Sequence, residues 1–270
     1  MISLKDQLQQ NGIIKVENVF SKEEIADVRQ SLQNYFENQW IECDCGKVQT
    51  NASVNCDFLK DVFTHPNMVS AMKLVTDGTP LFTGNADIHQ NRSSNWHKDS
   101  VFFDGDPFNK YHKPVYKVGI YLQDQQNKNI GIQYREGSHY VNNCIDGQNK
   151  AIPTRVGDVV IFDLRITHSG MLGTLPERIV WRISRLLSTE KKESSFGRRA
   201  KALIWKIYRT ERRESIFFVF GSDNETTEEF ARNIVKAQSS DPGHSAEISA
   251  QLLQELQTSG VKVCHSVNPS

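Results

Sequence analysis

The sequence has little that would tie it to a membrane, to nucleic acid or to an oxidising compartment. Lysine plus arginine and aspartate plus glutamate each number 32, so the formal net charge is zero and no global field draws the chain to polyanions. No apolar stretch approaches the length of a membrane span, and the opening MISLKD lacks the apolar core of a signal peptide. The five cysteines are odd in number and have no framework spacing. We therefore expect a cytoplasmic protein in a reducing setting, with a small molecule as its partner rather than nucleic acid or a membrane.

Helical patterns flank the chain on both sides. Ser21 and Glu24 form a capping box, and apolar residues then recur at spacings of three and four up to Phe36. A second helix is expected after Pro66, with an inward-facing side made of Met68, Met72, Leu74 and Val75. Residues 40–56 have no regular pattern. Towards the C-terminus, helices are expected over residues 226–237 and 245–258, followed by a loose tail from residue 260.

Between residues 80 and 188 the pattern changes to short β-like runs separated by turns. The expected strands are residues 81–90, 115–123, 130–135, 156–163 and 179–188, with one more at 215–221. No helix-length periodic stretch interrupts the span, which argues against alternating βαβ units. The pattern predicts a mainly β fold with flanking helices, built on an antiparallel double-sheet jelly roll. We expect one domain over residues 1–270, with the jelly-roll core at about 80–188 and helical flanks at 20–76 and 196–260.

The stretch Trp96-His97-Lys98-Asp99 contains His-x-Asp. In an extended backbone residues i and i+2 point to the same side, so the His97 imidazole and the Asp99 carboxylate can meet one metal ion. A second imidazole from far along the chain would complete a face of two histidines and one carboxylate with open positions opposite. That is the geometry of non-haem Fe(II) oxygenases.

The candidate for the distal imidazole is His168, which follows the apolar run at residues 159–162. Arg178 lies ten residues further on and opens the next β-like run. An iron oxygenase that takes its electrons from a 2-oxo acid must hold the far carboxylate of that acid, and a guanidinium can do so in a bidentate manner. Arg182 would share a strand face with Arg178 and is the alternative anchor, and Ser184 could add a hydroxyl.

Further pocket residues are expected on the strands beside the metal motif. Gln90, with His89 next to it, ends the strand that leads to the motif, and either could line the pocket. Lys117 and Tyr121 share one face of the following strand, and either could touch a co-substrate. His139 is interpreted as a structural histidine in a turn.

Taken in order, these segments resemble the phytanoyl-CoA dioxygenase-like branch of the Fe(II)/2-oxoglutarate oxygenases. The matching segments are WHKD at 96–99, VGIYLQD at 118–124, GIQYREGSH at 131–139, GDVVIF at 157–162, HSG at 168–170 and Arg178. The resemblance implies a double-stranded β-helix core. It also implies His97, Asp99 and His168 as iron ligands and Arg178 as the partner of 2-oxoglutarate. The interval between His168 and Arg178 is shorter than this branch leads one to expect, which leaves Arg182 open.

The resemblance implies an enzyme that uses Fe(II), 2-oxoglutarate and O2 to oxidise an unactivated C–H bond, releasing succinate and CO2. The expected substrate is a small-molecule metabolite or natural-product intermediate, and the expected outcome is hydroxylation, with desaturation and cyclisation as alternatives. Two other functions stay open: a non-catalytic jelly-roll binding module, and a cupin-like metal enzyme that does not use 2-oxoglutarate. The helical segment after residue 190 is expected to cover the barrel or to build a homodimer contact.

Overall fold

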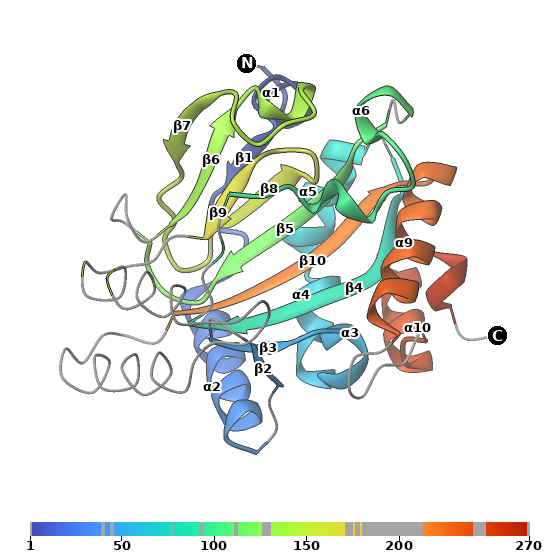
Figure 1. Ribbon diagram of the computed structural model, residues 1–270. Helices are drawn as coiled ribbons and strands as arrows, with labels where there is room; N and C mark the ends of the chain where they lie inside the picture. The colour runs from blue at the N-terminus through green and yellow to red at the C-terminus, as the bar shows by residue number, and fades with distance from the viewer. Residues whose placement is uncertain are drawn as a thin grey trace.

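Two β-sheets and a set of helices make up the part of the chain that the computed structural model describes (Figure 1). It describes residues 2–38, 41–43, 46–76, 78–91, 94, 96–110, 113–125, 131–170, 175, 179, 213–239 and 247–268. The strands are β1 (Ile13–Val16), β2 (Ile41–Cys43), β3 (Gly46–Gln49), β4 (Pro80–Gln90), β5 (Val115–Tyr121), β6 (Ile132–Glu136), β7 (Gln148–Ala151), β8 (Val159–Asp163), β9 (His168–Gly170), β10 (Glu214–Ser222) and β11 (Lys262–Val263). The helices are α1 (Leu4–Asn11), α2 (Lys22–Asn38), α3 (Ala52–Asn55), α4 (Lys60–Thr64), α5 (Pro66–Thr76), α6 (Pro107–Lys110), α9 (Glu225–Gln238) and α10 (Ala250–Ser259). Four 3-10 turns complete the set: η1 (Asp57–Leu59), η2 (Asp99–Phe102), η3 (Ser138–Tyr140) and η4 (His265–Val267).

The strands form a large and a small sheet. The large sheet has the order β1-β8-β5-β10-β4-β3-β2, with the short β11 pairing β4 in parallel, and the small sheet has the order β7-β6-β9. All other pairings are antiparallel. This arrangement confirms the predicted jelly-roll core, mainly β with flanking helices. The large sheet also takes in β1 and β10, which lie outside the 80–188 range expected for the core.

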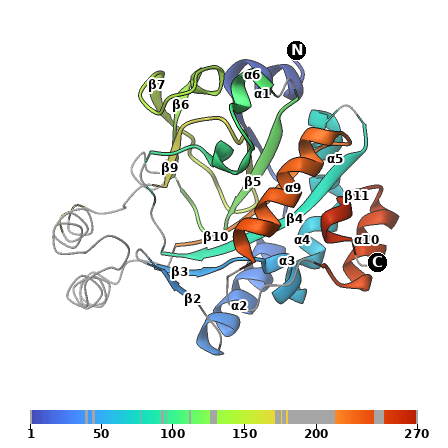
Figure 2. The same ribbon diagram turned by 45° about the vertical axis from the view of Figure 1, so that its right-hand side comes forward.

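Strand β5, at the centre of the large sheet, shows how one sheet serves both the core and a cavity. Val118 and Ile120 are fully buried in the main hydrophobic core, which also contains side chains of α2, α4, α5 and α10. Lys117 and Tyr121 alternate with them, so they point to the opposite face and line a cavity. Figure 2 shows α9 and α10 at the side of the molecule next to β4. Among the described residues, no helix is long and apolar enough to cross a membrane.

The helix predictions hold in outline and are wrong in three details. The capping box is confirmed, because Ser21 N donates to Glu24 Oε2 (2.7 Å) and Glu24 N donates to Ser21 Oγ (3.1 Å). Residues 40–56 are not wholly irregular, since β3 pairs with β4, β2 pairs with β3, and α3 packs on β4. Leu74 does not face inward but is 60% exposed. The tail from residue 260 is not loose, since β11 pairs with β4 and Cys264 is fully buried.

Helix α2 is joined to the large sheet by a buried carboxylate at the start of β10. Glu214 is fully buried and accepts from Arg29 Nε (2.8 Å) and Gln33 Nε2 (3.2 Å) on α2, and from Gln90 Nε2 (2.9 Å) on β4. A buried carboxylate is costly unless charged and polar donors surround it. Removing the cation leaves the carboxylate buried with only neutral donors among the described residues.

We therefore expect Arg29→Met, which keeps most of the aliphatic stem, to lower the free energy of unfolding by about 2 to 3 kcal/mol. The matched control is Arg232→Met. It removes a guanidinium that is half exposed and pairs with the exposed Glu225, and it should cost less than about 1 kcal/mol. Denaturant unfolding of both variants measures the difference. Equal losses would contradict the structural role given to the Arg29–Glu214 pair.

His139 is the structural turn histidine that the sequence predicts, buried in η3. Its Nε2 lies 2.9 Å from the carbonyl oxygen of Gln9, so this nitrogen carries the proton and donates. Its Nδ1 is buried with no hydrogen-bond partner among the described residues, and a side chain at Gly12 would collide with it. Burial is the main cause that lowers the pKa of His139, since a second proton on Nδ1 would find no acceptor.

The lowered pKa makes the stability of the protein depend on pH. The folded state binds fewer protons at His139 than the unfolded chain. The residue's contribution is therefore complete above the ordinary value of 6.5 and declines as the pH falls through the lower folded value. Unfolding at pH 7.5 and at pH 5.5, compared between wild type and His139→Gln, should show a larger loss of stability for wild type. A variant that loses as much as wild type would contradict the assignment.

Candidate active site

Two histidines 71 positions apart are brought together by a pair of backbone hydrogen bonds. His97 N donates to the carbonyl oxygen of His168 (3.0 Å), and His168 N donates to that of His97 (2.9 Å). Residues paired in this way stand directly opposite each other, so their side chains lie on the same face. The two imidazole centroids are 4.3 Å apart as a result.

Asp99 completes the group from the same short extended piece as His97. Lys98 has φ −121° and ψ 142°, so the side chains on either side of it point the same way. His97 Nε2 lies 3.5 Å from Asp99 Oδ1, and His168 Nε2 lies 3.7 Å from Asp99 Oδ2. One ligand atom from each residue lies within 4.8 Å of the other two. The three predicted ligands thus form a cluster that could hold a metal ion.

The orientation of His168 suits it to this role. Its Nδ1 lies 3.2 Å from the carbonyl oxygen of Ile166, which fixes the proton on that nitrogen and leaves the Nε2 lone pair directed to the cluster. The ring of Phe162 packs beside it with centroids 4.8 Å apart. Burial lowers the pKa of His168 to about 4 despite the opposing charge of Asp99. The imidazole is therefore neutral near pH 7, as metal ligation requires.

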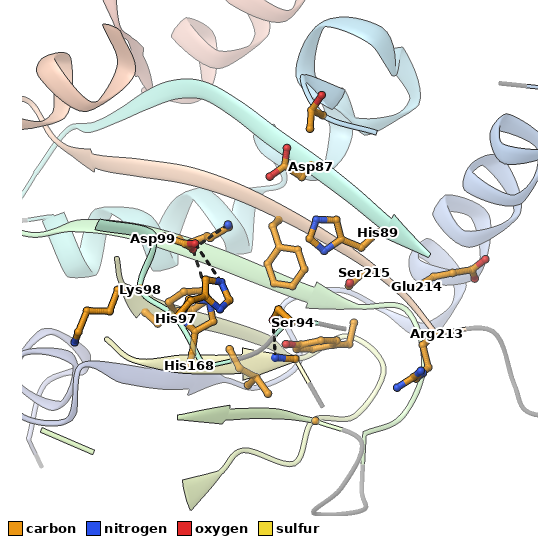
Figure 3. A pocket seen from close by; sticks show the side chains of 18 of the residues that line it. Asp87, His89, Ser94, His97, Lys98, Asp99, His168, Arg213, Glu214 and Ser215 are labelled. Atoms are coloured by element: carbon orange, nitrogen blue, oxygen red, sulfur yellow. Dashed lines mark hydrogen bonds and ion pairs between the residues drawn. The ribbon is translucent and has the colours of Figure 1, made fainter. Parts of the chain in front are cut away.

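Lys98 fixes the strand that carries His97 and Asp99. Its side chain points away from the two ligands (Figure 3), and its Nζ donates to the carbonyl oxygens of Ser138 and Arg165, both at 2.6 Å. Burial lowers the pKa of Lys98 to about 8. The ammonium thus ties the His-x-Asp segment to the turn after β6 and to the turn between β8 and β9.

The carboxylate of Asp99 also contacts a cation. Lys117 Nζ on β5 lies 3.0 Å from Asp99 Oδ2. Burial alone would raise the pKa of Asp99, but the charges of Lys117 and the neighbouring His168 and His97 outweigh it and hold the pKa well below its ordinary value. Asp99 is therefore an anion at any pH at which the protein would work.

The cluster lies in the wall of a cavity of about 530 Å³, within the size range of small-molecule sites. Polar side chains reach it from the inner face of the large sheet: Asp87, His89, Lys117, Gln123 and Ser215. Phe217 adds an aromatic surface beside Gly119, where a Cβ would come within 2.9 Å of the Phe217 ring. Val101 and Phe102 of η2 and Ala237 and Gln238 at the end of α9 also line it.

The other predicted pocket residues have different positions. Lys117 and Tyr121 line the cavity, as does His89. Gln90 is not among the lining residues, because its amide donates to Glu214 on the far side of the strand. Arg178, Arg182 and Ser184 lie outside the described residues, so their assignment as anchors of 2-oxoglutarate stays a prediction.

Arg213 is a cavity residue that sequence reasoning missed. It directly precedes β10, the first named strand after β9 in the described chain, and it lines the cavity together with Ser215 two residues later. Its backbone is fixed to the end of β4, since Asn91 N donates to its carbonyl oxygen (2.7 Å) and its own N donates to Asn91 Oδ1 (3.0 Å). Figure 3 shows His97, Asp99 and His168 at one side of the cavity, Arg213 towards the other, and Ser215 between. The signal was present in Arg213-Glu-Ser215 at the head of an apolar run, but residues 171–212 intervene.

Comparison with known proteins agrees with this fold. The family model of phytanoyl-CoA dioxygenase (PhyH) matches residues 8–171. A search of curated proteins finds no match. Similar solved structures include the epimerase SnoN in complex with Fe3+, alpha ketoglutarate and nogalamycin RO, which is 14% identical, with 91% of each chain covered and a TM-score of 0.59. The carbocyclase SnoK from nogalamycin biosynthesis is 17% identical over 80% of this chain and 81% of its own, with a TM-score of 0.55. HygX from Streptomyces hygroscopicus, with nickel and 2-oxoglutarate bound, is 13% identical over 82% and 87%, with a TM-score of 0.56.

At these identities the solved structures show a shared fold, that of the jelly-roll oxygenases. The family match is more specific, because it spans more than half of the chain and includes His97, Asp99 and His168. The chain belongs to the phytanoyl-CoA dioxygenase family, which is a family of Fe(II)- and 2-oxoglutarate-dependent oxygenases.

Proposed function

We propose that the protein is an Fe(II)- and 2-oxoglutarate-dependent dioxygenase that oxidises an unactivated C–H bond of a small-molecule metabolite or natural-product intermediate. The observation that carries the proposal is the meeting of His97, Asp99 and His168 in the wall of a cavity of about 530 Å³. Two imidazoles and one carboxylate are the donor set that Fe(II) oxygenases use, and they leave positions open for other ligands. Hydroxylation is the proposed outcome, with desaturation and cyclisation as alternatives.

The donor atoms fit the metal. The Nε2 atoms of both histidines and one oxygen of Asp99 would hold Fe(II), and the hydrogen bond from His168 Nδ1 to Ile166 already selects the required tautomer. When bound, Fe(II) supplies the reduction of O2 that is coupled to conversion of 2-oxoglutarate into succinate and CO2. The chain supplies position and the walls of the cavity. Lys98 holds the His-x-Asp segment rigid, and Phe162 packs on the His168 ring.

We assign the far carboxylate of 2-oxoglutarate to Arg213. A guanidinium binds a carboxylate in a bidentate manner, and Arg213 lines the cavity at a distance from the ligand cluster. Ser215 and Tyr121 are paired in the register of β10 and β5 and can add hydroxyl donors. Burial raises the pKa of Tyr121, so its hydroxyl keeps its proton. Gln123 is 4% exposed, and its Oε1 accepts from Glu214 N, which leaves its buried Nε2 without a partner among the described residues.

The rest of the cavity is suited to a substrate with both apolar and polar groups. Val101 and Phe102 give it an apolar edge, and Asp87 and His89 face it from β4. Its volume limits the reacting part of the substrate to a small molecule. SnoN and HygX were solved with nogalamycin RO and hygromycin B respectively, and both compounds are small molecules. Their structures support the substrate class and do not select a compound.

The proposal is tested by anaerobic titration of the protein with Fe(II) and 2-oxoglutarate, followed by exposure to O2 and measurement of succinate. We expect the visible charge-transfer absorption of the Fe(II)–2-oxo acid chelate and slow succinate release even without substrate. His168→Ala should weaken metal binding by more than about 100-fold, because a direct ligand is lost. The control His265→Ala removes an exposed histidine and should change nothing. Metal binding without any succinate would instead favour the binding module or the cupin-like enzyme.

Arg213→Ala should weaken 2-oxoglutarate binding by about 100-fold, or about 3 kcal/mol, since a charged carboxylate loses its cationic donor. Arg213→Lys should recover part of the loss, because it restores the charge without the bidentate geometry. Arg178→Ala and Arg182→Ala test the alternative anchors predicted from the sequence, and KM for 2-oxoglutarate is the measurement. A loss confined to Arg178→Ala or Arg182→Ala would return the role to the arginines first predicted from sequence.

A further inference from the structure

Lys117 has an unusual position for a lysine. It lies in the middle of a buried sheet and contacts the candidate metal ligand Asp99. Its Nζ lies 3.0 Å from Asp99 Oδ2, and its side chain is 14% exposed. Oδ2 is also the oxygen that faces His168, whereas Oδ1 faces His97 at 3.5 Å. The ammonium is thus in contact with the one anionic group of the cluster.

The position of Lys117 is fixed by its strand. β5 lies between β8 and β10 in the large sheet, and Lys117 pairs with Phe162 on one side and Val219 on the other. The ammonium also lies 5.4 Å from the centroid of the Phe217 ring. The backbone at Lys117 therefore cannot move the ammonium away when a metal binds. Only the Lys117 side chain can change position, within the cavity.

This contact has two consequences for a metal at the cluster. A lysine that holds Oδ2 leaves Oδ1 as the oxygen that Asp99 offers, which favours a single-oxygen ligand and keeps other positions open. The contact also sets the net charge that a metal ion meets at the cluster. The Asp99 carboxylate and the Lys117 ammonium cancel, so a divalent cation meets a carboxylate whose charge is already balanced. Electrostatic attraction for the metal alone is weaker there than at an unpaired carboxylate.

Binding of the dianionic co-substrate 2-oxoglutarate reverses this charge balance. Together, 2-oxoglutarate and Fe(II) carry no net charge, so the Lys117 ammonium would not oppose the pair as it opposes the bare cation. We propose that Lys117 is a positioning residue that makes the binding of Fe(II) and of 2-oxoglutarate depend on each other. It disfavours the bare metal and favours the metal–2-oxo acid pair. This inference rests on the proposed function of the site. It adds a physical reason for Fe(II) to bind more tightly when 2-oxoglutarate is present.

The test compares binding constants rather than turnover alone. Fe(II) affinity is measured anaerobically with and without 2-oxoglutarate, and the ratio of the two affinities is the coupling factor. The variants are Lys117→Met, which removes donor and charge, Lys117→Gln, which keeps a donor but no charge, and Lys117→Arg, which keeps the charge. Lys262→Met, which breaks the exposed pair with Asp223, is the matched control.

We expect Lys117→Met and Lys117→Gln to bind Fe(II) alone at least as tightly as wild type. Their coupling factor should fall about tenfold, with a higher KM for 2-oxoglutarate and little change in kcat. Lys117→Arg should retain the coupling, and Lys262→Met should behave as wild type.

A structural role alone gives a different pattern. If Lys117 only orients Asp99, its loss should weaken Fe(II) binding by 10- to 100-fold and leave the coupling factor unchanged, and that result would overturn the inference. The proposed function would survive it, provided wild type still bound Fe(II) and 2-oxoglutarate and released succinate. A wild-type protein that bound neither would overturn both.

Discussion

The paired backbone hydrogen bonds between His97 and His168 are the constraint on which the site depends. Side chains on paired strands alternate between faces, so a slip of one residue would turn one imidazole away from the other. Neighbouring bonds prevent that slip. Ser94 N donates to the Gly170 carbonyl oxygen (3.0 Å), and Ser169 Oγ donates to that of Ser94 (2.8 Å). The register between a short piece before η2 and the three-residue strand β9 thus places two ligands that the sequence keeps far apart.

The three candidate ligands could be predicted because each is part of a local pattern. The side chains of His-x-Asp point the same way whenever the backbone of that short piece is extended, which is a local property. His168 follows a strand whose apolar run is visible in the sequence. Arg213 could not be found the same way. The apolar run that follows it predicts a strand, but which strand pairs with which is a long-range property. β10 lies between β4 and β5 only in the folded sheet. The sequence pattern therefore points to Arg178 and Arg182, which lie outside the described residues, and does not point to Arg213.

The weakest predictions concerned short elements that tertiary contacts create. β2 and β3 form an antiparallel pair that extends the sheet from β4, and β7 pairs with β6, although neither segment has strong strand composition. β11 and the buried Cys264 are held by β4 and α9. The prediction that Leu74 faces inward is wrong for the opposite reason. Leu74 fits the hydrophobic pattern of α5, but no element of the described chain covers that position, so it is exposed there. Amphipathic spacing predicts which face of a helix is apolar. It does not predict how much of that face other elements cover.

Ionisable groups are concentrated where the large sheet would otherwise be apolar on both faces. Asp99 contacts Lys117, Glu214 accepts from Arg29, and the ammonium of Lys98 is satisfied by two carbonyl oxygens. Burying such groups costs stability, and replacing them by apolar side chains would often be neutral or favourable. The Asp99–Lys117 pair in the cavity wall is therefore better explained by the site than by folding, whereas Glu214 and Arg29 join α2 to the sheet. Because Lys117 lies on a strand inside the large sheet and Asp99 lies in the same short piece as His97, which pairs with His168, the Asp99–Lys117 pair is already oriented before a ligand arrives, and little reorganisation is needed on binding.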